Sequence, residues 1–167
     1  DIRLPRALLA ALVGGTLGLA GAALQGLLRN PLAEPGIIGI SNGAALGAVI
    51  VLYYGLAGSA WFVLPLGGLV GALLAVSCIF LLVGQSRSII TLILAGVAIN
   101  AIGGALIALA LNFAESPYAM QEIVFWLLGS VANRSFNELY IALPFLVLGW
   151  VMMLYCGRFL NALTLGE

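Results

Sequence analysis

Long apolar runs alternate with short polar breaks along the chain. Runs of about 20 apolar residues have the length of membrane-spanning helices. Four uncharged runs reach that length, namely Ala7–Leu28, Gly36–Ala57, Ala60–Val83 and Ser88–Ala114. Leu139–Cys156 is shorter but still long enough to span, whereas Ile123–Ala132 predicts a short helix at one membrane face, or a re-entrant piece. The pattern predicts five crossings, with the two ends of the chain on opposite sides.

The break between the first two runs is rich in polar and helix-breaking residues. Arg29 ends the first run, and the Asn30-Pro31 pair stops a helix because proline disfavours helical geometry in the residue before it. We expect Asn42 and Gly43 to interrupt the second run near its start. Irregular backbone at membrane depth is tolerated where protein buries it or where it lines a watery cavity. An ordinary polar hairpin loop is the alternative interpretation.

Composition supports a protein built for the bilayer. Hydrophobic residues make up 63% of the 167 residues and charged residues only 7%, whereas soluble domains average about 25% charged residues. We therefore predict an all-α fold, a polytopic transmembrane helix bundle. Glycines spaced four apart predict close helix packing, and they form the pairs Gly14 and Gly18, Gly43 and Gly47, and Gly67 and Gly71.

Several classes of chemistry lack their residues in this sequence. The chain has no histidine, which excludes Ser-His and Cys-His catalysis and histidine zinc sites. The predicted spans contain no ionisable group, which argues against an ion-driven carrier. Gln25 and Asn100 are polar residues within spans, and they either line a path or join helices by hydrogen bonds. Cys78 and Cys156 are expected to be free thiols.

Four motifs, in order along the chain, carry a resemblance to a known family. Residues 3–47 read RLPRALLAALVGGTLGLAGAALQGLLRNPLAEPGIIGISNGAALG. LILAGVAIN follows at Leu92–Asn100, WLLGS at Trp126–Ser130 and LNALTLGE at Leu160–Glu167. These motifs resemble the FecCD-type permeases, the membrane subunits of bacterial ABC importers for iron-siderophores, haem and cobalamin. The residues that match the signature are Gln25, Arg29, Asn30, Pro31, Pro35, Gly39, Asn42 and Gly43.

The resemblance implies a place for the chain within a longer fold. Members of the family have about ten spans, and this chain matches the second to the sixth. We expect residues 1–167 to form a single transmembrane permease domain, truncated at both ends. The family orientation places the start of the first predicted span at the periplasmic face, which charge counting leaves undecided.

Roles for particular residues follow from the resemblance alone. Arg3 and Arg6 match arginines that receive acidic residues of a periplasmic binding protein, and guanidinium groups suit that partner. Two arginines snorkelling at a helix end are the alternative. The translocation path and its cytoplasmic gate map to Ser88, Ile89, Ile90, Thr91, Gly96 and Asn100. The start of the ATPase-coupling region maps to Leu163, Leu165, Gly166 and Glu167, for which an ordinary frayed terminus is the alternative.

The expected function is that of a permease subunit of an ATP-driven importer in the bacterial inner membrane. The resemblance implies a permease homodimer or heterodimer, two cytoplasmic ATPase subunits and a periplasmic substrate-binding protein. We expect no enzymatic activity, no nucleic acid partner, no metal and no cofactor in this chain, with ATP and Mg²⁺ on the partner ATPase. The alternatives are a truncated or structural membrane subunit without independent transport, and a secondary transporter.

Overall fold

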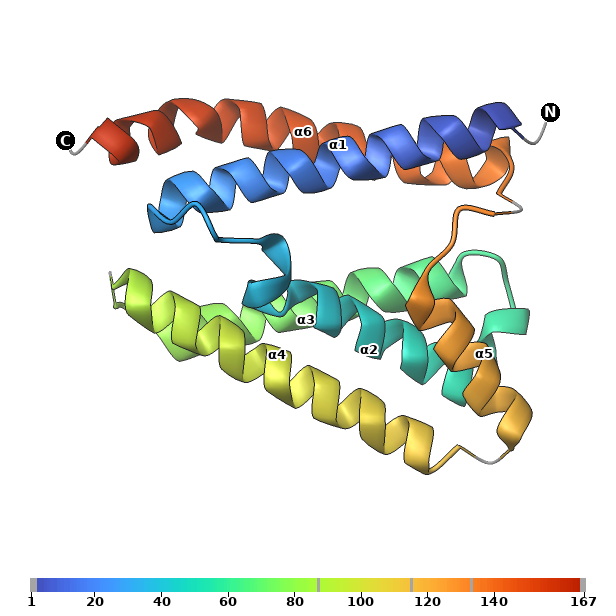
Figure 1. The fold of residues 1–167 in the computed structure, drawn as a ribbon. Coiled ribbons are helices and arrows are strands. Elements are labelled where there is room, and N and C mark those ends of the chain that lie inside the picture. The colour runs from blue at the N-terminus through green and yellow to red at the C-terminus, as the bar shows by residue number, and fades with distance from the viewer. Residues whose placement is uncertain (1–2, 87, 115, 133, 166–167) are drawn as a thin grey trace. The chain divides into compact units, whose positions relative to one another are not determined.

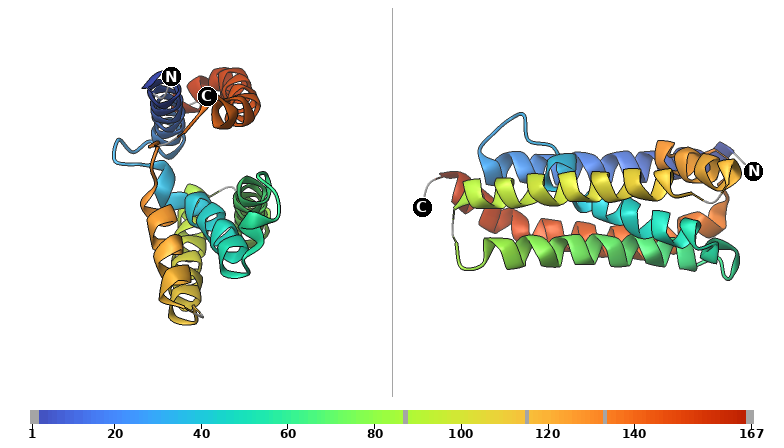
Figure 2. Two further views of the ribbon diagram at one scale, coloured as in Figure 1. Left: turned by 90° about the vertical axis from the view of Figure 1, so that its right-hand side faces the viewer. Right: turned by 90° about the horizontal axis from the view of Figure 1, so that it is seen from below.

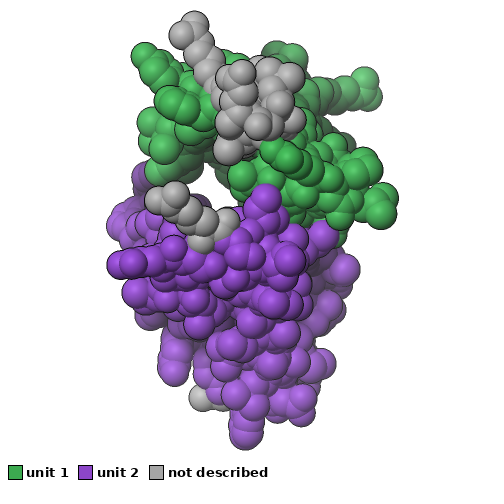
Figure 3. All heavy atoms as spheres, turned by 90° about the vertical axis from the view of Figure 1, so that its left-hand side faces the viewer, with its two compact units in different colours: residues 1–35, 130–167 green, residues 36–129 purple. Residues whose placement is uncertain are grey.

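The computed structural model describes residues 3–86, 88–114, 116–132 and 134–165, and it leaves the side chains of residues 158 and 160–165 undescribed. All secondary-structure elements of the described part are helices, and it contains no strand. It falls into two compact units, residues 1–35 with 130–167 and residues 36–129, which Figure 3 colours separately. The prediction of an all-α polytopic helix bundle is confirmed.

The first unit consists of two long helices that run in the same direction. Helix α1 spans Arg3–Leu28, and helix α6 spans Phe136–Leu165; they lie side by side with their N-terminal ends together (Figure 1). Pro5 sits in the first turn of α1, where a missing backbone N–H costs little. The start of α6 is capped because Glu138 accepts a hydrogen bond of 2.8 Å from the backbone N–H of Ser135.

The second unit contains the remaining helices. A 3₁₀-helix, η1 (Pro35–Ile38), leads into α2 (Ile40–Tyr53), and a second one, η2 (Leu56–Gly58), precedes α3 (Val63–Val83). Helices α4 (Ile89–Asn112) and α5 (Pro117–Leu128) complete the unit. The left view of Figure 2 shows α2 lying between α3 and α4, and α2 contacts both of them.

The core of the second unit lies where α2, α4 and α5 meet. Val49 and Leu52 of α2 pack with Ile107 of α4 and Ile123 of α5, and all four side chains are buried. Helix α5 begins at Pro117 because Ser116 caps it, accepting a hydrogen bond of 3.2 Å from the N–H of Ala119. The short helix therefore spans Pro117–Leu128, so the predicted bounds of 123–132 were wrong.

The surface of both units is largely hydrocarbon, as a lipid solvent requires. Large side chains such as Leu81 and Tyr155 are exposed, and the described residues include no buried polar side chain. Helices α1, α3 and α4 and residues Phe136–Gly157 of α6 are long and apolar enough to cross a membrane. Helix α2 has 14 residues, so it is about 21 Å long and shorter than a bilayer core of about 30 Å.

Candidate functional site

The polar break after α1 is an ordered loop held by hydrogen bonds. Gln25 Nε2 donates to the carbonyl oxygens of Pro31, at 3.0 Å, and Ala33, at 3.3 Å. Asn30 Oδ1 accepts a bond of 2.9 Å from the N–H of Leu32, and Arg29 takes a left-handed conformation with φ 48°. The signature residues Gln25, Arg29 and Asn30 thus shape this loop. Leu32, which lies within the same motif, has a side chain that is 83% exposed.

Backbone contact between the start of α2 and α4 depends on two glycines. Gly39 has φ +78°, and a Cβ there would lie 2.7 Å from Asn100 N and 2.9 Å from Gly96 O. A Cβ on Gly96 would lie 3.0 Å from Ile38 Cα. All three distances are shorter than ordinary contact, so only glycine allows these backbones to approach so closely. Sequence reasoning placed Gly39 in the family signature and Gly96 on the path, without pairing them.

An asparagine pair joins the same two helices. Asn42 Nδ2 donates to Asn100 Oδ1 at 2.7 Å and to the carbonyl oxygen of Asn100 at 3.2 Å. Asn42 and Gly43 lie inside α2, so the prediction that they interrupt the second run was wrong. The irregular backbone ends instead at Gly39, one residue before the helix. Of the two roles considered for Asn100, this geometry shows the interhelical bond, and the path role stays a prediction.

Closely packed glycines line the contact between α2 and α3. Gly43 and Gly47 of α2 face Gly67 and Gly71 of α3, with backbone atoms close enough that a Cβ on any of the four would meet its neighbours at 3.0 Å or less. The predicted close packing is confirmed for these two glycine pairs. A Cβ on Gly14 or Gly18 of α1 would meet nothing within 4 Å, so the third pair has no such partner in the described part of the chain.

The stretch before α4, the predicted cytoplasmic gate, is rich in hydroxyl groups. Ser86 Oγ donates to Thr91 Oγ1 at 3.2 Å, and it accepts from the N–H of Ser88 at the same distance. Ser88, Ile89 and Ile90 are exposed, while Thr91 is half-buried. Sequence reasoning missed Ser86, because the N-cap position of α4 belongs to Ser88 and no local pattern identifies a serine two residues before it.

The two helices of the first unit are fixed in register by a hydrogen bond. Trp150 Nε1 of α6 donates to Thr16 Oγ1 of α1 at 2.9 Å. No sequence pattern pointed to Trp150, because a tryptophan within an apolar run fits a lipid-facing position equally well.

Arg3 and Arg6 lie in the first turns of α1 with exposed side chains, at the same end of the unit as the start of α6.

The predicted coupling region lies at the opposite end of the first unit. Leu163 and Leu165 belong to the last turns of α6, and their side chains are outside the described part. Gly166 and Glu167 lie outside the described residues altogether. The geometry of the predicted ATPase contact therefore stays a prediction.

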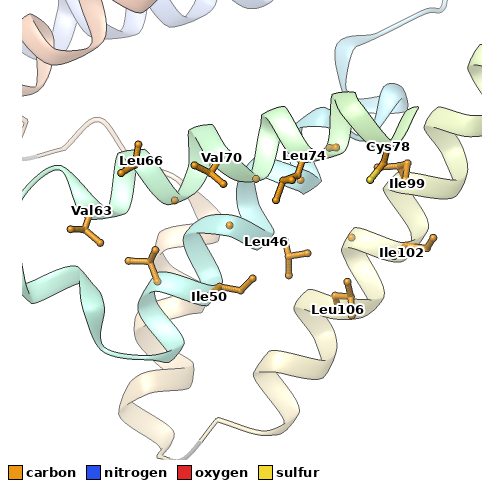
Figure 4. A pocket seen from close by; sticks show the side chains of 17 residues that line it. Leu46, Ile50, Val63, Leu66, Val70, Leu74, Cys78, Ile99, Ile102 and Leu106 are labelled. Carbon is orange, nitrogen blue, oxygen red and sulfur yellow. The ribbon is translucent and has the colours of Figure 1, made fainter. Parts of the chain in front are cut away.

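An apolar groove of about 480 Å³ opens between α3 and α4, with α2 at its base (Figure 4). Its walls are aliphatic side chains such as Leu66 and Leu74 of α3 and Ile102 of α4. The exposed thiol of Cys78 lies at one end of the groove. Such a lining offers no hydrogen bonds to a polar molecule, so the groove is suited to hydrocarbon.

The described residues hold no group of three or more carboxylate and thiol side chains that could bind a metal ion. The second unit contains hydrogen bonds between α2 and α4, closely packed glycines between α2 and α3, and hydroxyl side chains just before α4 and in its first turn. These features hold the helices of the second unit closely against one another.

Comparison with known proteins agrees with this geometry. The sequence model of the FecCD transport family matches residues 1–167. The uncharacterized ABC transporter permease protein YvrB of Bacillus subtilis is 45% identical, across the whole chain and 48% of YvrB. The iron(3+)-hydroxamate import permease FhuG of the same organism is 37% identical, covering all of the chain and 52% of FhuG. The vitamin B12 import permease BtuC of Klebsiella pneumoniae is 38% identical, over all of the chain and 50% of BtuC.

A solved structure shares the fold. It is an inward-facing ABC transporter assigned to the metal-chelate type, with a TM-score of 0.89 and 32% identity, covering all of this chain and 53% of that one. The chain thus spans about half the length of the relatives it matches. With four span-length helices among its described residues, it is a multi-pass membrane protein. Since the family match extends over every residue, the chain belongs to the FecCD transport family.

Proposed function

We propose that the chain is the α1–α6 part of a permease subunit that forms the translocation pathway of an ATP-driven importer. The observation that carries the proposal is the full-length match to a family of ABC importer permeases, at up to 45% identity. The joined helices α2 and α4 support it, because a pathway needs helices that hold their packing while they move. Helices α2, α3 and α4 contain no Asp, Glu, Lys, Arg or His, the residues on which ion-driven carriers rely, which favours an external energy source.

The proposed cargo is an iron-siderophore, with haem and cobalamin as the competing substrates. A hydroxamate permease and a vitamin B12 permease match the chain almost equally well, so identity does not rank their substrates. In this proposal substrate affinity belongs to the periplasmic binding protein, and the permease supplies a weakly binding path. Two ATPase subunits and a second permease subunit complete the machine, and ATP is hydrolysed on the ATPase.

Uptake into liposomes tests the proposal. The permease that carries this sequence is reconstituted with its ATPase, and a loaded binding protein is supplied outside. Ferric hydroxamate, cyanocobalamin and haemin are offered in turn, each as a labelled compound. We expect ATP-dependent uptake of ferric hydroxamate, lost when a non-hydrolysable analogue replaces ATP, and uptake of cyanocobalamin or haemin instead would assign that compound as the cargo. Uptake driven by a proton or sodium gradient without ATP would establish the secondary transporter instead.

A further inference from the structure

The start of α2 meets α4 near the middle of that helix. Asn100 lies eleven residues after Ile89, the first residue of the 24-residue α4, which places it about 16 Å along a helix of about 36 Å. Asn42, in the first turn of α2, bonds to it. The irregular backbone before Ile40 therefore joins the helical part of α2 at the depth of the centre of α4.

Two different contacts hold this junction together. Gly39 and Gly96 let the backbones touch, but contact between small residues alone allows helices to slide along one another. The Asn42 amide prevents sliding, since it donates to both the side chain and the backbone carbonyl of Asn100. A polar pair of this kind sets the register of an otherwise apolar helix interface.

The amide groups of the pair face each other across the interface. Both residues are half-buried, and the described chain contains no buried side-chain nitrogen or oxygen without a hydrogen-bond partner. At the far end of α2, Tyr53 Oη donates to the carbonyl oxygen of Phe113 at 2.9 Å, just beyond the end of α4. Polar bonds thus connect the two helices near both ends of α2.

We propose that Asn42 is a positioning residue that fastens the start of α2 to the middle of α4, so that the two move as one body during the nucleotide-driven cycle. The proposal rests on the proposed function, because it needs a cycle in which α4 moves. Movement of α4 then carries η1 and the irregular backbone before Ile40 with it. Without Asn42, the glycine contact remains but no longer fixes the register of the two helices.

Spin labels at Ser41 and Val97 measure the separation of α2 and α4 beside the asparagine pair in the reconstituted transporter. Both positions are exposed, and both lie within one turn of the asparagine pair. Cys78 and Cys156 are first replaced by serine, since both native thiols are exposed. The separation of the two labels is then measured without nucleotide and with a bound ATP analogue.

The variants are chosen to remove the bonds in steps. Asn42→Ala removes both bonds, whereas Asn100→Ala removes the bond to Oδ1 and keeps the acceptor on the backbone. The double variant should behave like Asn42→Ala alone, because Asn42 is the donor in both. Asn112→Ala is the matched control, since it changes the same residue type at the exposed end of the same helix.

With the pair intact, we expect the label separation to be the same in both nucleotide states. In Asn42→Ala we expect it to differ between the states by about 1–2 Å, the scale of helix shifts at packed interfaces, and to differ less in Asn100→Ala. A separation that changes with nucleotide in the intact protein would overturn the proposal. A separation that stays constant in Asn42→Ala would also overturn it, and a lower melting temperature alone would then assign Asn42 a stabilising role only.

Failure of the proposed function is detected separately. The uptake assay on the unlabelled protein decides whether the machine is an ATP-driven importer. Active uptake combined with a constant label separation in Asn42→Ala would reject the positioning role of Asn42 and would support the importer function. Absence of ATP-dependent uptake would reject the importer function, and with it the proposed role of Asn42 in the nucleotide-driven cycle.

Discussion

The contact between α2 and α3 gives the sharpest prediction about stability. A Cβ on Gly47 would lie 2.9 Å from the carbonyl carbon of Gly67 and 3.0 Å from Gly71 Cα, and closer still to the carbonyl oxygen of Gly67. Ordinary contact begins at 3.4 Å. In Gly47→Ala the two backbones must therefore separate by at least 0.5 Å, because the obstructing atoms are backbone and have no rotamer to change.

The size of the effect follows from two opposing terms. Alanine favours a helix over glycine by about 1 kcal/mol, and forcing an extra methyl group into a packed interface costs about 1–3 kcal/mol. Gly14→Ala gains the same helix propensity but meets nothing within 4 Å. The difference between the two variants therefore isolates the contact, and we expect Gly47→Ala to be less stable than Gly14→Ala by about 1–3 kcal/mol.

Thermal unfolding in detergent, followed by circular dichroism, measures the difference. For a chain of this size each kcal/mol corresponds to about 2–4 °C in melting temperature. Both variants are purified and compared with the parent chain in the same detergent. Equal melting temperatures for Gly47→Ala and Gly14→Ala would refute the close packing of α2 on α3.

Three further predictions concern other parts of the chain. Gly39→Ala should destabilise the protein more than Gly55→Ala in the same unfolding assay, because both have positive φ but only Gly39 also has backbone atoms in the way of a Cβ. Trp150→Phe should cost about 0.6 kcal/mol, the average for interhelical bonds in membranes, and at most about 1.7 kcal/mol. Thr16→Val also removes the local bond from Thr16 Oγ1 to the carbonyl oxygen of Leu12, but adding Trp150→Phe to it should cost little more, since the bond between the two side chains is already absent; additive losses would contradict this. Single cysteines at residues 88 to 91 should change their labelling rate with nucleotide, and constant rates would contradict the gate assignment.

The pattern of apolar runs predicted the helices well because a bilayer leaves few alternatives to them. The ends of α1, α3 and α4 differ from the predicted runs by only a few residues. The start of α2 was more difficult to predict. Hydropathy continues without a break from Gly36 to Ala57, whereas α2 begins only at Ile40, because η1 and the left-handed Gly39 precede it.

The candidate site shows a different limit of sequence reasoning. Glycine spacing predicted which helix faces could pack closely. It did not predict that Gly43 and Gly47 pack against α3, whereas a Cβ on Gly14 or Gly18 would contact none of the described residues. Pairing across the fold is a long-range property. The bond between Asn42 and Asn100 joins residues 58 positions apart, and no local pattern identifies such a pair.

The most direct test of the central claim is ATP hydrolysis by the assembled transporter. The permease that carries this sequence is co-expressed with its candidate ATPase and reconstituted in liposomes, with and without a loaded binding protein. We expect the binding protein to stimulate hydrolysis, and we expect the stimulation to disappear when Arg3→Glu and Arg6→Glu are combined, because both positions are exposed and the new carboxylates then repel the acidic partner that the guanidinium groups attract. Failure of the permease to associate with any ATPase would contradict the importer and favour a structural membrane subunit.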